Sequence, residues 1–201
     1  IAFAIDNCIN FAQIIPGFHW AQAENTLLYA FNLSENNEQM AVFYNFMNGK
    51  QRVQSVQDLL AVAAGHSSFV IARALNSTET LLTITNSIGF VIASTTVPLL
   101  VQRVAIGDRV AVFTHDHSIG VWRFEEENPP IVNQLNTKVG AICILGKQLF
   151  VSSGNDVIVY DAPSLTEVTR YEVGVTCESL SVSCNGECLA LVDKIGTLQF
   201  Y

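Results

Sequence analysis

The sequence has few charged residues and no long apolar run. Only 14% of its 201 residues are charged, while 50% are hydrophobic. A helix that spans a membrane needs about 18 consecutive apolar residues. The most apolar stretch, "GFVIASTTVPLLVQ", is interrupted by Ser94, Thr95, Thr96 and Pro98. We therefore expect ample material for a core and no direct insertion into a membrane.

Basic residues are scarce as well. Ten Lys and Arg stand against 18 Asp and Glu, which gives a formal net charge of −8 and a pI near 4.8. Such a surface repels a phosphate backbone, so nucleic acid is excluded as an expected partner. No signal peptide is visible. The chain starts at Ile1 and ends at Tyr201 within a strand-like run, so we expect a piece of a larger polypeptide with a further domain upstream.

Cysteines are few, and the five present lack the spacing of metal ligands. Cys184 and Cys188 flank "NGE" and could face each other across a three-residue hairpin loop. For most of the five we expect small buried side chains in a reducing compartment. Asn32-Leu33-Ser34 and Asn76-Ser77-Thr78 match the glycosylation pattern, which has no consequence in a cytoplasmic protein.

Catalytic motifs are also missing. The sequence has no G-x-S-x-G, no phosphate-binding loop and no dinucleotide fingerprint. "NGKQRV" and "GKQLF" contain Gly-Lys pairs without the upstream glycine and the following Ser or Thr of a phosphate loop. We therefore predict no catalytic residues, no cofactor-binding residues and no metal ligands.

Short β-strands are what the sequence does contain. Runs rich in Val, Ile, Phe and Leu alternate with Gly, Asn, Asp and Pro clusters, and Asn48-Gly49 predicts a hairpin. The nearest helix candidate, "SVQDLLAVAAG" from Ser55 to Gly65, fits a buried strand almost as well. Aromatic residues are dense in the first 50 positions, and their alternation predicts core roles. They are Phe18, Trp20, Tyr29, Phe31, Phe43, Tyr44 and Phe46.

Three segments repeat one pattern, starting at Val104, Ile142 and Leu180. Each has an apolar strand, a glycine turn, a second apolar strand, an Asp or Asn turn and an alternating strand. The third strand closes on Trp122, Tyr160 or Tyr201, a spacing of roughly 40 residues that is typical of a four-stranded propeller blade. A fourth segment, "LNSTETLLTITNSIGFVIAS", matches the copy at Leu180 without gaps, with Asn86 on Asp193, but it ends on Ser94. Residues 11 to 55 are strand-rich and fit the pattern poorly.

The spacing in "DHSIGVWRF" from Asp116 resembles the WD-repeat signature, in which an Asp turn precedes alternating apolar residues and Trp. "DVIVYDA" and "GTLQFY" resemble the same ending, and Gly65-His66 resembles the Gly-His that opens such repeats. The resemblance covers residues 65 to 201. It implies a WD40-like β-propeller in which the closing aromatic fills the interface between blades. Degenerate repeats of this kind also occur at the carboxyl end of BEACH-domain proteins, which implies a role in membrane trafficking.

The segment "THDHSIGVWRF" admits a second interpretation. His115 and His117 lie two residues apart and would project to one face of a strand, as metal-ligand pairs do, with His19 as the available third donor. The alternative is a polar turn between the second and third strands of a blade, where other copies have Gly154-Asn155 and Asp193-Lys194. We favour the turn. The acidic "FEEENPP" and the polar "LSENNEQ" are expected to be solvated loops, and the acidic one would favour a basic partner.

The sequence thus predicts an all-β WD40-like β-propeller fragment of about four blades. Residues 1–64 would form a strand-rich N-terminal region with the first blade or blades, and residues 65–201 the recognisable WD40-like blades. The expected function is a non-enzymatic, cytoplasmic scaffold, peripheral to membranes through the full-length protein, that binds proteins or peptides through its rim and top face. The alternatives are a propeller enzyme or glycan-binding propeller with a site near His115 and His117, and a bacterial-type surface propeller.

Overall fold

A computed structural model describes residues 2–5, 8–11, 19–32, 39–183 and 185–201. Those residues form strands and turns and contain no helix. A small antiparallel sheet pairs β1 (Ala2–Ile5) with β2 (Cys8–Phe11). The rest of the described chain builds five larger sheets in chain order, four with four strands and one with three.

Every large sheet is an antiparallel meander, so strands adjacent in sequence are adjacent in space. The first sheet contains β3 (His19–Ala23), β4 (Thr26–Asn32), β5 (Gln39–Asn45) and β6 (Gln51–Ser55). The second contains β7 (Leu59–Ala64), β8 (Ser68–Ala74), β9 (Thr80–Asn86) and β10 (Val91–Val97). The third contains β11 (Arg103–Ile106), β12 (Val110–His115), β13 (Ser118–Arg123) and β14 (Ile131–Gln134). The fourth contains β15 (Val139–Leu145), β16 (Gln148–Ser153), β17 (Asp156–Asp161) and β18 (Thr166–Glu172). The fifth contains β19 (Cys177–Val182), β20 (Leu189–Asp193) and β21 (Leu198–Phe200).

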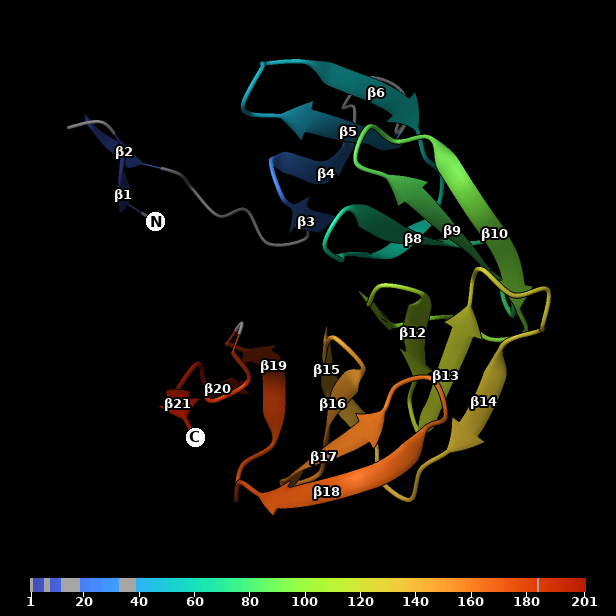
Figure 1. The fold of residues 1–201 in the computed structure, drawn as a ribbon, viewed down its shortest axis with the longest axis vertical. Helices are drawn as coiled ribbons and strands as arrows, with labels where there is room; N and C mark the ends of the chain where they lie inside the picture. The colour runs from blue at the N-terminus through green and yellow to red at the C-terminus, as the bar shows by residue number, and fades with distance from the viewer. Residues whose placement is uncertain (1, 6–7, 12–18, 33–38, 184) are drawn as a thin grey trace.

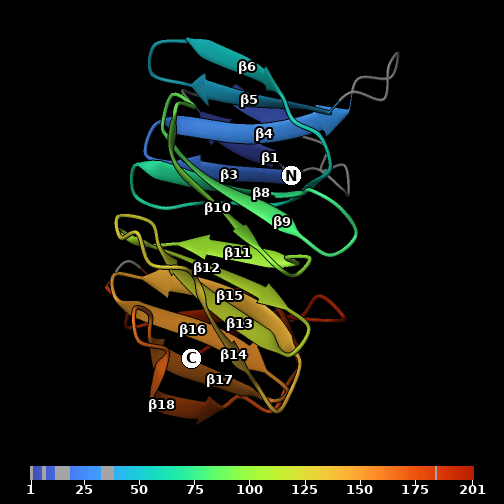
Figure 2. The same cartoon turned by 90° about the vertical axis from the view of Figure 1, so that its right-hand side faces the viewer.

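The five sheets follow one another around an arc, with their first strands toward the centre and their last strands outside (Figure 1). Seen from the side, successive sheets lie face to face (Figure 2). The first strands β3, β7, β11, β15 and β19 contact their neighbours in that order. This is the arrangement of propeller blades, so the predicted all-β propeller fragment is confirmed. About four blades are expected from the sequence, and the structure has four four-stranded blades and a fifth with three strands.

The meander sends the connections of each sheet to two opposite ends of the molecule. One end, which we call the linker face, holds the connections between sheets and the turns between second and third strands. It comprises residues 56–58, 75–79, 98–102, 116–117, 135–138, 154–155, 173–176 and 194–197. The other end, the hairpin face, holds the turns that join first to second and third to fourth strands, such as 65–67 and 124–130.

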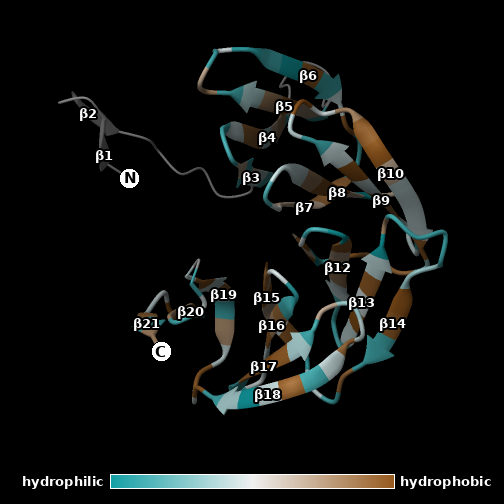
Figure 3. Ribbon diagram, in the orientation of Figure 1, coloured by the Kyte–Doolittle hydropathy of each residue, from teal (hydrophilic) through white to brown (hydrophobic). Residues whose placement is uncertain are grey.

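The core lies between the sheets, because alternate residues of one strand pack against two neighbouring sheets. On β12, Ala111 and Phe113 join the cluster shared with the second sheet, whereas Val110 and Val112 join the cluster shared with the fourth. Two further clusters fill the other interfaces. Hydrophobic colour accordingly concentrates on the inner and middle strands, with an apolar stretch also at the start of the outer strand β10 (Figure 3).

The closing aromatics behave in two ways. Trp122 and Tyr160 are buried in interfaces between sheets, as the repeat predicts. Tyr201 does not follow the prediction, because half of its surface is exposed. Its hydroxyl donates a 2.8 Å hydrogen bond to the carbonyl of Val173, in the connection before the fifth sheet.

The three repeats that start at Val104, Ile142 and Leu180 each occupy the first three strands of a sheet, as predicted. The fourth segment, residues 75–94, lies one strand out of step with the other three. Its Asn86 ends β9, the third strand of its sheet, whereas Asp193 ends β20, the second strand of its sheet. Gly65-His66 does not open a repeat either, because it lies in the turn between β7 and β8.

The N-terminal part holds a complete sheet over residues 19–55, although it fits the repeat poorly. Asn48-Gly49 lies in the hairpin between β5 and β6, with Gly49 at a φ of 68°, as predicted. The stretch "LLAVAA" is the strand β7 and not a helix. The expected division between residues 64 and 65 falls inside the second sheet, between β7 and β8.

The N-terminal aromatics are only partly core residues. Phe43 is buried, and Tyr29 and Phe31 are half-buried. Trp20, Tyr44 and Phe46 are exposed, which corrects the prediction. β3 and β5 lie in a sheet of which one face covers the neighbouring sheet, so alternation buries only every second side chain. Phe18 and most of "LSENNEQ" lie outside the described residues.

Among the described cysteines, Cys143 and Cys177 belong to the core cluster of the fourth and fifth sheets, as expected, whereas Cys188 is exposed. Cys188 lies opposite Ser183, whose amide donates to the Cys188 carbonyl. The suggested pairing with Cys184 lies outside the described residues. Within the residues described, no helix is both long and apolar enough to cross a membrane.

Candidate functional site at the linker face

His115, Asp116 and His117 form a turn at the linker face. His115 ends β12, Ser118 begins β13, and the two residues pair across the hairpin. Asp116 has a φ of 46°, a left-handed conformation that Asp tolerates better than most residues. The prediction of a polar turn between the second and third strands is confirmed, and Gly154-Asn155 and 194–197 occupy the equivalent turns.

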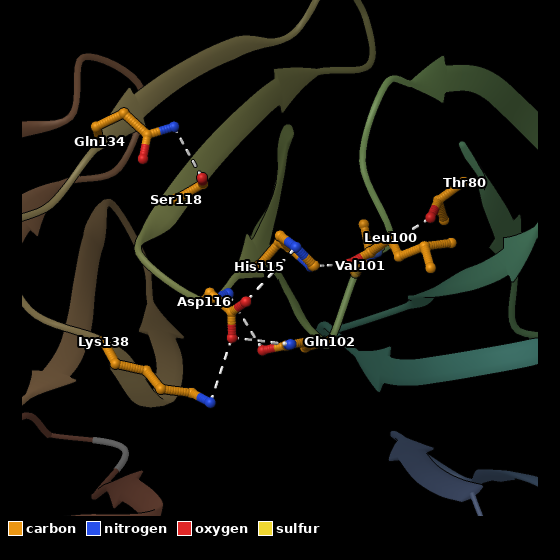
Figure 4. Close-up of polar contacts among 9 residues, drawn as sticks. All are labelled: Thr80, Leu100, Val101, Gln102, His115, Asp116, Ser118, Gln134 and Lys138. Carbon is orange, nitrogen blue, oxygen red and sulfur yellow. Dashed lines mark hydrogen bonds and ion pairs between the residues drawn. The ribbon is translucent and has the colours of Figure 1, made fainter. Parts of the chain in front are cut away.

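Asp116 connects this turn to two neighbouring linkers (Figure 4). Gln102, in the connection before β11, donates a 3.2 Å hydrogen bond from Nε2 to Asp116 Oδ1 and accepts one from the Asp116 amide. Lys138, in the next connection, places Nζ 3.2 Å from Asp116 Oδ1. The hydrogen bond from Gln102, and then that from Lys138, holds the pKa of the Asp116 carboxyl below its ordinary value. The side chain is well solvated, so these contacts position the segments more than they stabilise the fold.

His115 lies beside Asp116, with its Nε2 3.7 Å from Asp116 Oδ2, and faces the connection that carries Leu100 and Gln102 (Figure 4). Its Nδ1 donates a 2.5 Å hydrogen bond to the carbonyl of Leu100, in the connection between β10 and β11. Thr80 holds the same connection, donating from its hydroxyl to Leu99 at 2.8 Å and accepting from the amide of Val101 at 3.0 Å. His115 is therefore occupied in fixing a linker.

The same arrangement recurs around the linker face. The amide of Leu135 donates to the carbonyl of His117, and that of Val139 donates to Asp116. In the next sheet, the amides of Val173 and Gly174 donate to the carbonyl of Asn155. Each of these linkers is thus hydrogen-bonded to the turn of the sheet that it leaves, which fixes the shape of this face. Sequence reasoning found the turns and missed Gln102 and Lys138, because no repeated spacing marks the linkers.

The alternative metal site is not assembled by the described residues, which contain no group of three or more His, Cys, Asp or Glu side chains arranged to hold an ion. His19, the suggested third donor, starts β3 and lines a cavity with Trp20, Gln102 and Arg103. Burial lowers the pKa of His19. The acidic loop at 124–130 lies at the hairpin face, where Glu125 and Glu126 pair with Arg109 and Arg123.

Two adjoining cavities open near the centre of the arc. The one at the linker face has a volume of about 580 Å³, and its lining includes Arg103, Lys138, Thr176, Glu178 and Lys194. The inner one, of about 320 Å³, is lined by first strands and includes His19 and Trp20. Both cavities are lined by Gln102, Arg103 and Glu178. We call these two adjoining cavities the central mouth.

Basic side chains gather at the central mouth. Arg103 Nη2 lies 3.4 Å from Glu178 Oε2, and Lys138 pairs with Asp116 as described. Lys194 lines the same cavity from the turn after β20. Three of the ten Lys and Arg residues of an acidic chain therefore line one cavity, together with a single acidic side chain, Glu178. Volumes of this size are typical of binding sites.

Comparison with known proteins identifies the family. Residues 20–137, more than half of the chain, match the model of the WDR35 second beta-propeller family. The chain belongs to this family. Over its whole length it is 22% identical to WD repeat-containing protein 35 of Rattus norvegicus and, likewise, of Mus musculus. A 62-residue stretch, 31% of the chain, is 34% identical to WD repeat-containing protein 35 of Homo sapiens, of which it covers 5%. The chain spans 21% of the length of the rat and mouse relatives.

Solved structures show the same fold. The chain is similar to KlHsv2 with loop 6CD replaced by a Gly-Ser linker, with a TM-score of 0.67 at 12% identity, over 92% of this chain and 61% of the other. It is also similar to Hsv2 of Kluyvelomyces marxianus, with a TM-score of 0.51 at 12% identity, over 92% of this chain and 70% of the other. At this identity the likeness establishes the fold alone.

These findings correct one part of the expected relationship. The WD40-like propeller is confirmed, whereas the BEACH-domain origin is not supported, because the matching relatives are WD repeat-containing protein 35. The sequence signal was the degenerate Asp-to-Trp spacing, which many WD-repeat families share and which therefore could not distinguish between them.

Proposed function

We propose that this chain is a non-enzymatic interaction module within a larger WD-repeat protein and that it binds other proteins through its linker face. The observation that carries the proposal is the central mouth, a two-part cavity whose walls are held in place by the linker hydrogen bonds. A preformed, well-anchored surface binds with little loss of conformational freedom. The membership of a WD-repeat family supports the scaffold role.

The polar groups at the linker face favour binding over catalysis. His115 and Asp116 are occupied with linker atoms, and Asp116 keeps a lowered pKa, which suits a permanent carboxylate and not a general acid. We further propose a cytoplasmic location in the full-length protein, based on Cys143 and Cys177, which lie in one core cluster without forming a disulfide. The membrane-trafficking role rested on the BEACH resemblance and is not part of the proposal.

A bulky, uncharged substitution on each face tests the proposal. Thr176 is exposed in the linker before β19 and lines the central mouth, and Ser67 is exposed in a turn of the hairpin face. Proteins that co-purify with the full-length protein are to be quantified by mass spectrometry for the wild type, Thr176→Trp and Ser67→Trp. We expect Thr176→Trp to lose specific partners and Ser67→Trp to retain them. If only Ser67→Trp lost its protein partners, the interaction would lie on the hairpin face.

The rival propeller enzyme or glycan-binding propeller has its own test. Metal content is to be measured in the purified full-length protein and in His117→Ala. We expect no stoichiometric metal in either. Stoichiometric zinc or manganese that disappears with His117→Ala would support the rival instead.

A further inference from the structure

We propose that the central mouth binds an acidic, extended segment of a partner protein that carries one large apolar side chain. The inference rests on the proposed function, since it names the chemistry of the partner that the linker face accepts. Three observations support it: the charge of the lining, the exposure of its ion pairs and the position of Trp20.

The charge of the lining selects carboxylates. Arg103, Lys138 and Lys194 converge on the outer cavity from three different sheets or linkers, and Glu178 is the one acid among its lining residues. Elsewhere the chain is acidic, and the hairpin face carries the run Glu125 to Glu127. An acidic segment is therefore attracted to the mouth and repelled by the hairpin face, which gives both orientation and specificity.

The internal ion pairs of the mouth can be exchanged for ligand carboxylates. The side chains of Arg103 and Glu178 are 40% and 48% exposed, and those of Lys138 and Asp116 are 66% and 46% exposed. Exposed pairs of this kind contribute little to stability, so replacing one partner by a ligand carboxylate costs little. Within the described residues Lys194 makes no ion pair, so its ammonium group is available at once.

Trp20 supplies the apolar contact. It lines the inner cavity and is 65% exposed, although it is one of only two tryptophans in the chain. Leu60 and Val62 of β7 line the same cavity. Large aromatic side chains in such positions are typical anchors of binding energy. Because the two cavities adjoin at Arg103 and Glu178, a segment held by the basic side chains outside can place an apolar side chain beside Trp20 inside.

Fluorescence anisotropy with a defined probe tests this inference. The probe is a short fluorescein-labelled peptide in which several glutamates flank one leucine, titrated with the full-length protein. Its control peptides carry glutamine in place of glutamate, or serine in place of leucine. We expect the glutamate peptide to bind, the glutamine peptide to lose binding, and the affinity to fall with added salt.

Matched protein variants locate the site. Lys138→Glu with Lys194→Glu reverses two charges at the mouth, and Lys50→Glu with Lys147→Glu makes the same charge change at the hairpin face. We expect the first pair to weaken binding about tenfold, because two attractive charge contacts become repulsive, and the second to change it less than about twofold. Trp20→Ala should lower affinity for the leucine peptide and leave the serine peptide unchanged.

Three results would overturn the inference. The glutamine peptide could bind equally well, both charge-reversed pairs could weaken binding equally, or vesicles containing phosphatidylserine could bind through Lys138 and Lys194 while the peptide does not. The last result would identify an anionic membrane as the ligand. If Thr176→Trp loses protein partners while the glutamate peptide does not bind, only this inference fails and the proposed function stands.

Discussion

Gly120 shows how tightly single residues are constrained between the sheets. It pairs with Phe113 across β12 and β13, and a β-carbon on Gly120 would lie 2.2 Å from two atoms of the Phe113 ring. Phe113 is fully buried in the interface with the second sheet. The missing side chain of Gly120 is therefore what makes room for the aromatic ring.

We expect Gly120→Ala to lower the free energy of unfolding by about 1–3 kcal/mol, because the ring of Phe113 must move within a packed core. Urea unfolding followed by circular dichroism measures the change. Gly146→Ala is the control, since nothing lies within 4 Å of its β-carbon position, although its φ of 58° carries a backbone cost of about 1 kcal/mol. Adding Phe113→Leu to Gly120→Ala should recover part of the loss. If the losses of unfolding free energy from Gly120→Ala and Phe113→Leu simply added in the double variant, the proposed clash would be contradicted.

Cys143 illustrates the effect of burial on a titrating group. Burial raises the pKa of its thiol from the ordinary 9.0 to about 12, whereas Cys188 is exposed. The thiolate is the species that reacts with alkylating reagents. We expect iodoacetamide to modify Cys188 in the folded protein and to spare Cys143, as peptide mass mapping would show. Equal rates for the two thiols would contradict the burial of Cys143.

The same shift has a consequence for stability. Between pH 9 and pH 12 the unfolded chain loses the Cys143 proton and the folded chain keeps it, so stability falls as the pH rises through this window. Below about pH 9 both states are protonated and Cys143 adds no pH dependence. Urea unfolding of the wild type and of Cys143→Ala across this window should show a shallower fall in the variant. Parallel curves would contradict the shift.

At the scale of elements, the turn at Asp116 acts as a clamp on two linkers. Gln102 precedes β11 and Lys138 precedes β15, and both contact the Asp116 carboxylate. The turn also needs a residue that tolerates a φ of 46°. Asp116 therefore combines a backbone role with a side-chain role, and the two can be separated by substitution.

We expect Asp116→Ala to lower the urea midpoint, since it removes the carboxylate and replaces Asp by a residue that tolerates the left-handed conformation less well. Asp116→Asn should cost less, because Asn tolerates this conformation and retains a hydrogen-bond acceptor. Urea midpoints for both variants provide the measurement. Because the pKa of Asp116 is lowered in the folded state, its contribution is present above the ordinary carboxyl pKa and is lost as the pH falls through the lowered value. Equal losses from the two substitutions, or a loss with Asp116→Asn that persists in acid, would contradict the proposed role of the carboxylate.

Individual strands and turns could be predicted from the sequence, but their places in the sheets could be predicted only in part. Strands, hairpins and the Asp116 turn could be predicted, because alternation and turn residues act locally. The error in the fourth repeat has a local cause too. Asn86 and Asp193 cap their turns alike, each accepting amide hydrogen bonds from residues two and four positions later. The same side-chain cap thus occurs in the turn between second and third strands and in the turn between third and fourth strands. An alignment based on this cap is therefore shifted by one strand.

The candidate site could not be predicted, for a different reason. Its key contacts join residues that are far apart in the chain, such as Arg103 with Glu178 and Lys138 with Asp116. Nothing in the local sequence around Lys138 or Lys194 marks them as neighbours of a common cavity. Trp20 was expected in the core because alternation shows that one face of a strand differs from the other without showing what covers each face.

At the scale of the whole molecule, five sheets packed around an arc bring their linkers and turns to one face. Four apolar clusters join the neighbouring sheets, and hydrogen bonds hold each of the linkers described above to the turn beside it. As a result, hydrogen-bonded linkers and turns form the walls of a cavity that has a basic lining. The fold thus presents a charged, preformed surface at the linker face, which suits the proposed role as an interaction module.

The most direct test of this account is site-specific photo-crosslinking in cells that express the full-length protein. A benzophenone amino acid replaces Lys138 or Lys194 at the central mouth, and Lys50 or Lys147 at the hairpin face, one position at a time. The account predicts discrete adducts to other proteins from the first two positions and none from the other two. Adducts from Lys50 and Lys147 alone would contradict it and would place the binding surface at the hairpin face.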